Sequence, residues 1–329
     1  MRFLQFAAAA ASAAVVTAGV CTAVQAQSGS TVRVIAANPQ GSVFYSASAT
    51  LGKVLADKLK MQVRVQPMGG SSTYIPLLNR GEVDFGLTNV DDAVKSFNGK
   101  GGFSRPNPDL RLMAASFYLT FGILVPGNSP VQKVEDLKGL KIASGYKSQV
   151  TGAVLQDAAL ATGGLTMKDL RGVPTPSLFS GTDMLGDGKV DAASLAVGAA
   201  QVASANISLK SRGGVRFLDL DDSPKSLAAV RKFLPARFVT VQPGGNRAGI
   251  VKPTKLIGYT VFFSTHAKMA DDVVYALVKM LRDSKAELVK GTPVFAGFDP
   301  ARMTEETGVP WHPGAIRFYK EIGQWPPKG

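Results

Sequence analysis

The fold is decided by residues 67–92, which read PMGGSSTYIPLLNRGEVDFGLTNVDD. Ser71 and Ser72 are good N-cap residues, so a helix is predicted from about Thr73, and Gly81 is predicted to end it. The run Val83–Leu87 is predicted to be a short buried strand. The stretch therefore predicts a loop, a helix, a turn, a strand and the start of another helix, which is typical of an α/β fold.

The same stretch contains candidate ligand-binding residues. Gly69 and Gly70 let the backbone approach a ligand closely, because neither carries a Cβ. The helix start at Ser71 offers unpaired N–H groups and a partial positive charge, which suit a carboxylate or a phosphate. Asn89 and Asp91 lie at the carboxyl end of the strand, where open α/β sheets hold their ligands. We therefore predict that Gly70, Ser71 and Asn89 bind a ligand; the alternative is an ordinary βαβ loop with its caps.

The first residues have the features of an export signal. A lone positive charge precedes an apolar, alanine-rich run at residues 3–20, and residues 24–26 (VQA) resemble a cleavage site. We predict a signal peptide at residues 1–26, cleavage after Ala26 and a periplasmic mature protein. A lipoprotein signal at Cys21 is the alternative. Because Cys21 is the only cysteine, the mature chain is expected to form no disulfide and no cysteine-based metal site.

Cleavage would leave a chain of a length that suits two lobes. The full sequence of 329 residues has a formal net charge of +13 and a hydrophobic content of 45%, which is ordinary for a soluble protein. The basic residues are scattered, which favours attraction of small anions over binding of nucleic acid. We expect a monomer that binds a small organic anion and no nucleic acid.

Two crossings are expected to divide the mature chain. We predict lobe I at residues 27–126, lobe II at residues 127–252, and a return to lobe I with the C-terminal helices at residues 253–329. The first crossing is predicted at residues 126–130, which are rich in Pro and Gly. The strongly β segment at residues 257–264 is expected to carry the chain back.

Lobe I offers two further candidate residues near the start of its first helix, which is predicted to run to about Leu59. Ser42 is a plausible N-cap of this helix. Tyr45 lies in the first turn, where its hydroxyl could reach a ligand; a half-buried packing role is the alternative. Strands are also predicted at residues 110–116 and 121–125, and Tyr118 between them is predicted to wall a cleft.

Lobe II contains a second loop from a strand to a helix at residues 144–148, which read SGYKS. Ser148 is the predicted cap of the helix, and Thr151 lies in its first turn. Lys147 is the one cation at a candidate anion site; a solvated surface lysine is the alternative. With Val197, these residues complete the predicted ligand-binding set.

An internal repeat supports two lobes of the same α/β design. Residues 78–84 and residues 185–191 both match the pattern L-x-x-G-x-V-D, and each copy is followed by a strand of small residues. Asp84 and Asp191 end the two copies at junctions between a turn and a strand. A structural hydrogen bond is the expected role of an aspartate at such a junction.

Catalytic chemistry is not predicted from this sequence. The only histidines are His266 and His312, and no hydrolase, metalloprotease, P-loop or dinucleotide-binding motif accompanies them. We therefore predict no catalytic residue, no metal and no cofactor, and expect both histidines to be surface or packing residues. The alternative in another class is an exported hydrolase or transferase, which would need a buried acid–base pair in the cleft.

The whole mature chain resembles the TAXI family, the solute-binding subunits of one class of TRAP transporters. Met68 departs from the family loop T-G-G-S, where Thr is usual. The matching stretches are residues 41–45 (GSVFY), 69–71 (GGS), 81–86 (GEVDFG), 134–141 (VEDLKGLK), 272–277 (DVVYAL) and 312–319 (HPGAIRFY).

The resemblance implies a type II periplasmic-binding fold with a hinge and an interlobe cleft. It also implies closure on a small carboxylate, such as glutamate or 2-oxoglutarate, and delivery to a TRAP membrane permease; signalling to a sensor kinase is the alternative. The family usually has G-x-P-G-S-G-T where this chain has SGYKS at residues 144–148. Because this loop gains Lys147 and an aromatic residue, we predict that Lys147 contributes to a site for an aromatic or dicarboxylic acid.

Overall fold

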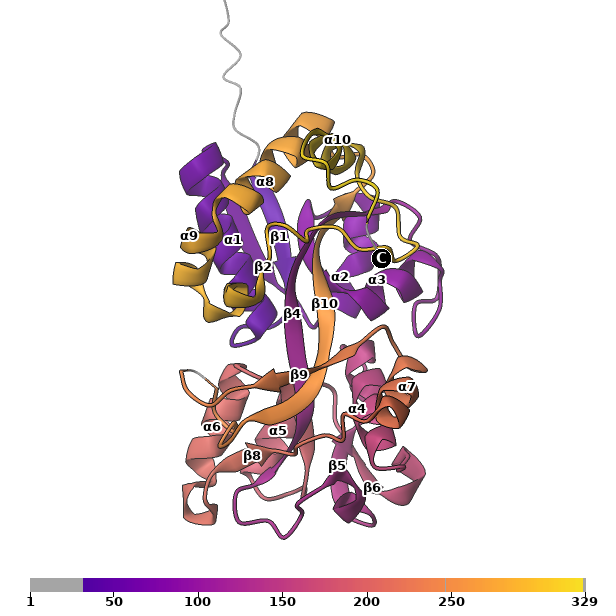
Figure 1. Cartoon of the computed structure of the whole chain (residues 1–329), viewed down its shortest axis with the longest axis vertical. Coiled ribbons are helices and arrows are strands. Elements are labelled where there is room, and N and C mark those ends of the chain that lie inside the picture. Colours follow the sequence, from indigo (N-terminus) through magenta and orange to yellow (C-terminus); the bar gives the residue numbers. More distant parts are fainter. Residues whose placement is uncertain (1–31, 246, 328–329) are drawn as a thin grey trace, which may run out of the picture. The chain divides into compact units, whose positions relative to one another are not determined.

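The computed structural model describes residues 32–245 and 247–327. The predicted signal peptide and its cleavage site lie outside these residues. The described elements form two groups joined by two long strands (Figure 1). We call the group containing β1–β3, α1–α3 and α8–α10 lobe I, and the group containing β5–β8 and α4–α7 lobe II.

Lobe I is built on three parallel strands. β1 (Arg33–Ala37) pairs with β2 (Val63–Pro67) on one side and with β3 (Phe85–Asn89) on the other. The helices that follow these strands are α1 (Val43–Leu59), α2 (Ser71–Arg80) and α3 (Val90–Phe97). The predicted order of elements is confirmed, but neither Ser71 nor Ser72 caps α2. The N-cap is Gly70, so the helix begins earlier than predicted.

Lobe II repeats this path. β5 (Lys141–Ser144) pairs in parallel with β6 (Arg171–Pro174). One parallel bridge joins Ile142 of β5 to Ala192, the residue before β7 (Ala193–Ala196). The helices are α4 (Val150–Thr162), α5 (Leu178–Gly186) and α6 (Ala200–Ser208). The predicted cap of α4 is wrong by one residue. Gln149, and not Ser148, stands at its N-cap.

Two antiparallel strands, β4 (Leu110–Pro126) and β10 (Thr254–His266), pass through both groups (Figure 1). The two strands predicted at residues 110–116 and 121–125 are therefore one. Pairing with β10 continues through the supposed junction, where Val261 faces Phe117 and Thr260 faces Tyr118. In lobe I β10 pairs with β3, and in lobe II β4 pairs with β7. The residue limits of the lobes stay a prediction.

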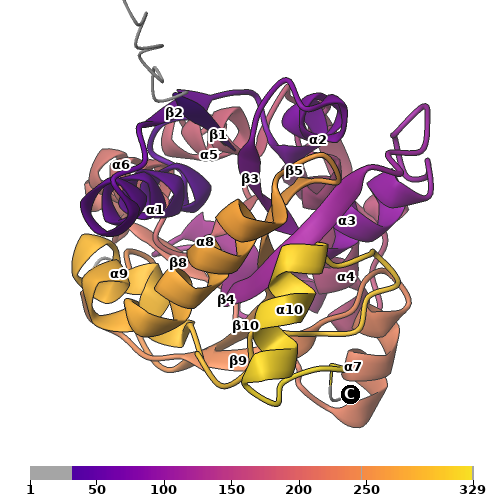
Figure 2. The same ribbon diagram turned by 90° about the horizontal axis from the view of Figure 1, so that it is seen from above.

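The remaining elements complete the two lobes. Lobe II also contains β8 (Val215–Phe217), which pairs with β4, and α7 (Pro224–Arg231). β9 (Arg237–Val241) pairs with β10 beside them. The C-terminal helices α8 (Asp271–Asp283), α9 (Lys285–Gly291) and α10 (Pro313–Glu321) belong to lobe I, where α8 and α10 lie side by side (Figure 2). No helix in the described part of the chain is both long and apolar enough to cross a membrane.

The internal repeat has a structural basis. The Asp84 carboxylate accepts a hydrogen bond from the Val34 backbone N–H at 2.8 Å, and its own N–H donates to the Val34 carbonyl at 3.0 Å. Asp191 makes the same pair of bonds to Lys141, both at 2.9 Å. Each aspartate therefore fixes the start of the first strand of its lobe, β1 or β5, and the predicted structural role is confirmed.

The two histidines are packing residues, as predicted. His312 is fully buried and caps α10, because its Nδ1 accepts a hydrogen bond from the Gly314 N–H at 3.2 Å. Its Nε2 lies 3.0 Å from the Met269 carbonyl. His266 is also buried and packs near Gly81. These contacts are those of structural residues.

Candidate functional site

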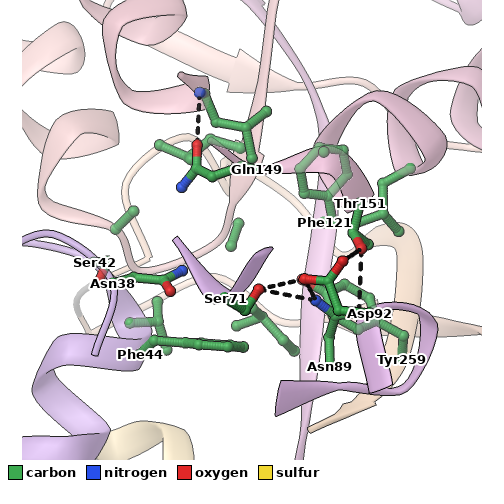
Figure 3. Close-up of a pocket in the computed structure, with 18 of the residues that line it drawn as sticks. Asn38, Ser42, Phe44, Ser71, Asn89, Asp92, Phe121, Gln149, Thr151 and Tyr259 are labelled. Carbon is green, nitrogen blue, oxygen red and sulfur yellow. Dashed lines mark hydrogen bonds between the residues drawn. The ribbon is translucent and has the colours of Figure 1, made fainter. Parts of the chain in front are cut away.

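A cavity of about 60 Å³ lies between lobe I and lobe II (Figure 3). Its lobe I side is mostly polar and its lobe II side is mostly apolar. The polar side chains are those of Asn38, Ser42, Ser71, Asn89, Asp92, Gln149 and Thr151. The apolar ones include Phe44, Leu119, Phe121, Leu155, Leu178, Phe179, Leu195 and Tyr259.

One end of the cavity is formed by the start of α1. Ser42 is the N-cap, as predicted, and its Oγ accepts a hydrogen bond from the Tyr45 N–H at 3.0 Å. The N–H groups of Val43 and Phe44, the first two residues of the helix, have no acceptor within it. Both residues line the cavity, beside Asn38, whose buried Oδ1 has no hydrogen-bond partner. This end of the cavity therefore offers backbone donors and the positive end of a helix dipole.

The opposite end contains a buried carboxylate, that of Asp92 (Figure 3). It accepts hydrogen bonds from the Ser71 hydroxyl, from Asn89 Nδ2 at 2.9 Å and from Thr151 Oγ1 at 2.6 Å. The Asn89 side chain also accepts from the Asp92 N–H at 2.8 Å, and so caps α3. Because Thr151 belongs to α4, the carboxylate joins the two lobes.

Within the described residues, the Asp92 carboxylate has no cationic partner within 4 Å. Asp91, the next acid along α3, pairs with Lys95 at 2.8 Å, and burial raises its pKa. Burial, followed by the negative charges of Asp92 and Asp91, raises the pKa of Tyr259, which lines the cavity. Among the described residues that line the cavity, none is a lysine or an arginine. A ligand group with a positive charge or a hydrogen-bond donor therefore suits this end.

The lobe II wall begins at the first turns of two helices. Gln149 precedes α4, and its Oε1 accepts a hydrogen bond from the Leu178 N–H at the start of α5, at 2.8 Å. This bond holds the two helix starts together. Leu155 of α4 and Phe179 of α5 then present apolar side chains to the cavity.

The lobes also touch directly beside the cavity. The Ala200 N–H donates to the Gly41 carbonyl at 2.9 Å, and the Val150 N–H donates to Ser72 Oγ at 3.3 Å. Gly70 lies so close to the Ser148 carbonyl that a Cβ on it would clash. The described structure is therefore a closed arrangement of the lobes.

Four of the ten predicted ligand-binding residues line the cavity, namely Ser42, Ser71, Asn89 and Thr151. Gly70 and Ser148 meet at the edge of the cavity, where the lobes touch. Val197 follows the lining residue Ala196, and its N–H donates to the Thr120 carbonyl at 3.0 Å. A ligand-binding role for each of them stays a prediction.

Like Gly70, Ser148 and Val197, the remaining three predicted residues do not line the cavity. Tyr45 is half-buried, and its backbone N–H serves the cap of α1. The Tyr118 hydroxyl accepts a hydrogen bond from Arg237 at 2.6 Å, on the other face of β4. Lys147 is exposed. The structure therefore does not bring Lys147 together with the residues of the cavity.

Asp92 is the most important residue that the sequence prediction missed. The prediction placed Asp91 at the strand end, but the first turn of α3 directs the next residue into the cavity. The spacing of Asn89 and Asp92, an N-cap residue and an acid three positions later, is that of a capping box and was the available signal. Gln149 and Tyr259 had no comparable motif.

Comparisons with known proteins agree with this architecture. A family model described as the NMT1-like family matches residues 35–323. The structure is similar to PhnD1 from Prochlorococcus marinus in complex with methylphosphonate, with a TM-score of 0.54 and 11% identity over 89% of this chain and 98% of that chain. It is also similar to AbpA from Streptococcus pneumoniae, an amino acid ABC transporter substrate-binding protein bound to L-arginine. For AbpA the TM-score is 0.50 and the identity 14%, over 81% of this chain and 95% of that chain. At these identities the likeness establishes the fold alone, and it confirms the predicted two-lobed type II periplasmic-binding fold.

Proposed function

The chain belongs to the NMT1-like family, and we propose that it is a periplasmic solute-binding subunit that captures a small organic solute by closure of its lobes. One observation carries this proposal. A cavity that is polar on its lobe I side lies where the starts of α1, α2 and α4 converge, and direct bonds join the lobes beside it. A site between two lobes suits binding, because closure around a ligand strengthens polar contacts by excluding water.

The proposed solute is a small organic acid with one acid group. The free N–H groups at the start of α1 suit a carboxylate, as the sequence analysis expects for an organic anion. A dicarboxylate fits less well, because Asp92 would repel a second carboxylate at the other end. Within the predicted class we therefore favour an amino acid, whose ammonium group would face Asp92.

The size of the cavity favours a compact solute. The cavity, at about 60 Å³, has room for several water molecules. A solute of about the same number of heavy atoms, or slightly more, would replace them. The apolar lobe II wall suits a short aliphatic side chain.

The proposed partner is the membrane permease of a TRAP-type transporter, to which the closed protein would deliver its solute. The resemblance to the TAXI family supports this partner. The export signal predicted at residues 1–26 supports a periplasmic location, and we propose that the protein acts as a monomer.

Calorimetry with a matched ligand set tests the proposed function. The probes are L-valine, 3-methyl-2-oxobutanoate, isobutylamine and succinate, titrated into the mature protein. We expect L-valine to bind best, the oxo acid at least tenfold more weakly, and the other two not at all. A thermal-shift screen of further small acids extends the set, because a ligand raises the melting temperature with the logarithm of its excess over Kd. If no small acid binds or raises the melting temperature, the proposed function is wrong.

A further inference from the structure

A second hollow lies on the other face of the strands that form the hinge. Side chains alternate between the faces of a strand, and residues opposite each other on paired strands share a face. Leu119 and Tyr259, which are paired, line the cavity. Tyr118 and Thr260, which are also paired, line a groove of about 810 Å³ on the other face, and this groove reaches Tyr259 as well. The cavity and this hinge groove are therefore back to back on β4 and β10.

The hinge groove is basic. Arg231, Lys232 and Arg237 line it, all three are exposed, and within the described residues none of them has an acidic partner within 4 Å. The one acid in its wall, Glu305, is engaged by the Thr260 hydroxyl at 2.7 Å. The residues that line the groove therefore have a net positive charge, which attracts an anion.

The groove also offers flat and apolar surface. The Arg237 guanidinium lies 4.0 Å from the centre of the Tyr118 ring, so a planar cation already stacks on an aromatic wall. Phe233 is 38% exposed, and Leu234 and Pro235 line the groove beside it. An exposed phenylalanine among unpaired cations suits an anion with an aromatic body.

One wall of the groove belongs to the lobe II end of the two long strands, and the other wall belongs to their lobe I end. Arg237 belongs to β9, which pairs with the lobe II end of β10. Glu305 belongs to the C-terminal segment, which the Ala115 N–H anchors to the lobe I half of β4 by a 2.8 Å bond to the Met303 carbonyl. The pairing of β10 with β4 is irregular between Val261 and Phe262, next to the groove, and such irregularities bend strands.

From this geometry we propose that the hinge groove is a second ligand site, for an aromatic carboxylate or other flat organic anion, and that its occupant favours the closed lobes. Bending β4 and β10 toward the cavity moves the groove walls apart, and bending them away narrows the groove. A ligand that fits the groove in its wide form therefore binds the closed state preferentially and shifts the equilibrium toward it. The inference does not depend on which solute enters the cavity.

Isothermal titration of the mature protein with benzene-1,3-dicarboxylate tests the site, with benzamide as the uncharged aromatic control. We expect binding of the dicarboxylate that weakens with added salt, and no binding of benzamide. The double variant Arg231→Gln/Arg237→Gln is expected to lose at least tenfold in affinity. Lys210→Gln, which changes an exposed cation elsewhere in lobe II, and Asn38→Ala, which changes a cavity residue whose Oδ1 has no hydrogen-bond partner, should leave the affinity unchanged.

Two results would overturn the proposal. Equal binding by wild type and the double variant would show that the dicarboxylate does not use the groove, and a loss of binding in Asn38→Ala would assign it to the cavity. Small-angle scattering at saturating dicarboxylate tests the coupling to the hinge. If the free wild-type protein is open, the dicarboxylate should decrease its radius of gyration. A radius that stays the same or increases would refute the effect on closure.

Discussion

In lobe I the third strand, β3, ends at Asn89, and the helix after it brings the buried carboxylate of Asp92 to the cavity. In lobe II the corresponding strand, β7, ends at Ala196, and the helix after it has Ala199 at its N-cap, with no side-chain cap. The strand order and the aspartates that start β1 and β5 are nevertheless the same in both lobes. The comparison teaches that the repeated residues maintain the backbone frame, whereas the residues that differ decide what each lobe offers to a ligand.

Replacing Gly70 by Ala should have the largest effect, because it acts where the two lobes meet. The backbone at Gly70 is extended, at φ 166°, so alanine would not strain lobe I itself. Its Cβ would clash with the Ser148 carbonyl of lobe II only when the lobes are closed. Overpacking of this kind costs about 1–3 kcal/mol, so we expect roughly 10- to 100-fold weaker binding of L-valine.

The melting temperature of the ligand-free protein separates this effect from misfolding. A matched control is Gly69→Ala, where the Cβ would lie 3.3 Å from the Ser148 side chain and not against its backbone. If both variants bind like the wild type, direct contact of the lobes at Gly70 does not limit closure.

Asp84 and Asp191 occupy equivalent positions, and replacing each one tests whether the backbones of the two lobes depend on it equally. Asp84→Ala removes a hydrogen bond to a backbone N–H and an ion pair with Arg33 at 2.8 Å, so we expect unfolding to become easier by about 2 kcal/mol. Asp191 is exposed and has only the backbone bonds, so Asp191→Ala should cost about 1 kcal/mol. Chemical denaturation measures both. Asp187→Ala, which removes an exposed ion pair with Lys189, is the control with little expected change.

Asp92→Asn tests the chemical difference between the lobes. The amide keeps the shape of the side chain and removes its charge, so L-valine should lose about tenfold in affinity if its ammonium group faces this residue. The oxo acid, which has no positive charge, should bind the variant as well as it binds the wild type or better. Calorimetry on both ligands decides; equal losses would mean that Asp92 acts only as a bond between the lobes.

The smallest expected effect is that of pH on stability. It should be confined to the lobe I side, because both histidines of the chain belong to that side. Burial lowers the pKa of His312 from its usual 6.5, and it does the same for His266. Each ring therefore binds a proton more readily in the unfolded chain, so stability that is present above pH 6.5 is lost as the pH falls toward the folded pKa.

Hydrogen exchange between pH 7 and pH 5 checks this effect by region. After correction for the intrinsic rate, protection in α10 should decrease while protection in α5 of lobe II stays constant. The variant His312→Asn, which keeps a capping side chain, should flatten the change in α10. Equal losses of protection in both helices would refute the assignment to His312.

Much of the frame follows from local patterns in the sequence. The turn at Gly81, the cap at Ser42 and the repeated aspartates each depend on residues that are neighbours in the chain or face one adjacent strand. Three elements escaped prediction for physical reasons. β6 contains Gly172 and Pro174, which are poor strand formers, and it exists because β5 pairs with it. β9 and the undivided β4 both depend on pairing with β10, which is distant in the sequence.

The site was less predictable because its geometry comes from contacts between the lobes. Thr151 was identified from its place in a first turn, but its partner Asp92 lies in the other lobe. Lys147 is only a few residues from Thr151, yet its side chain is exposed. Sequence position indicated which loops reach the cavity, and only the packing of α4 against α3 decides which side chains enter it.

The two long shared strands also govern how this chain folds. Residues that pair across β4 and β10, such as Phe121 and Ile257, are far apart in the sequence. The eight-stranded sheet cannot be completed until β10 has formed, because β10 pairs with β3, β4 and β9. Loop closure over such separations is slow, so the sheet that runs through both lobes should be completed only after β10 has been synthesised, in a late step that joins the two halves.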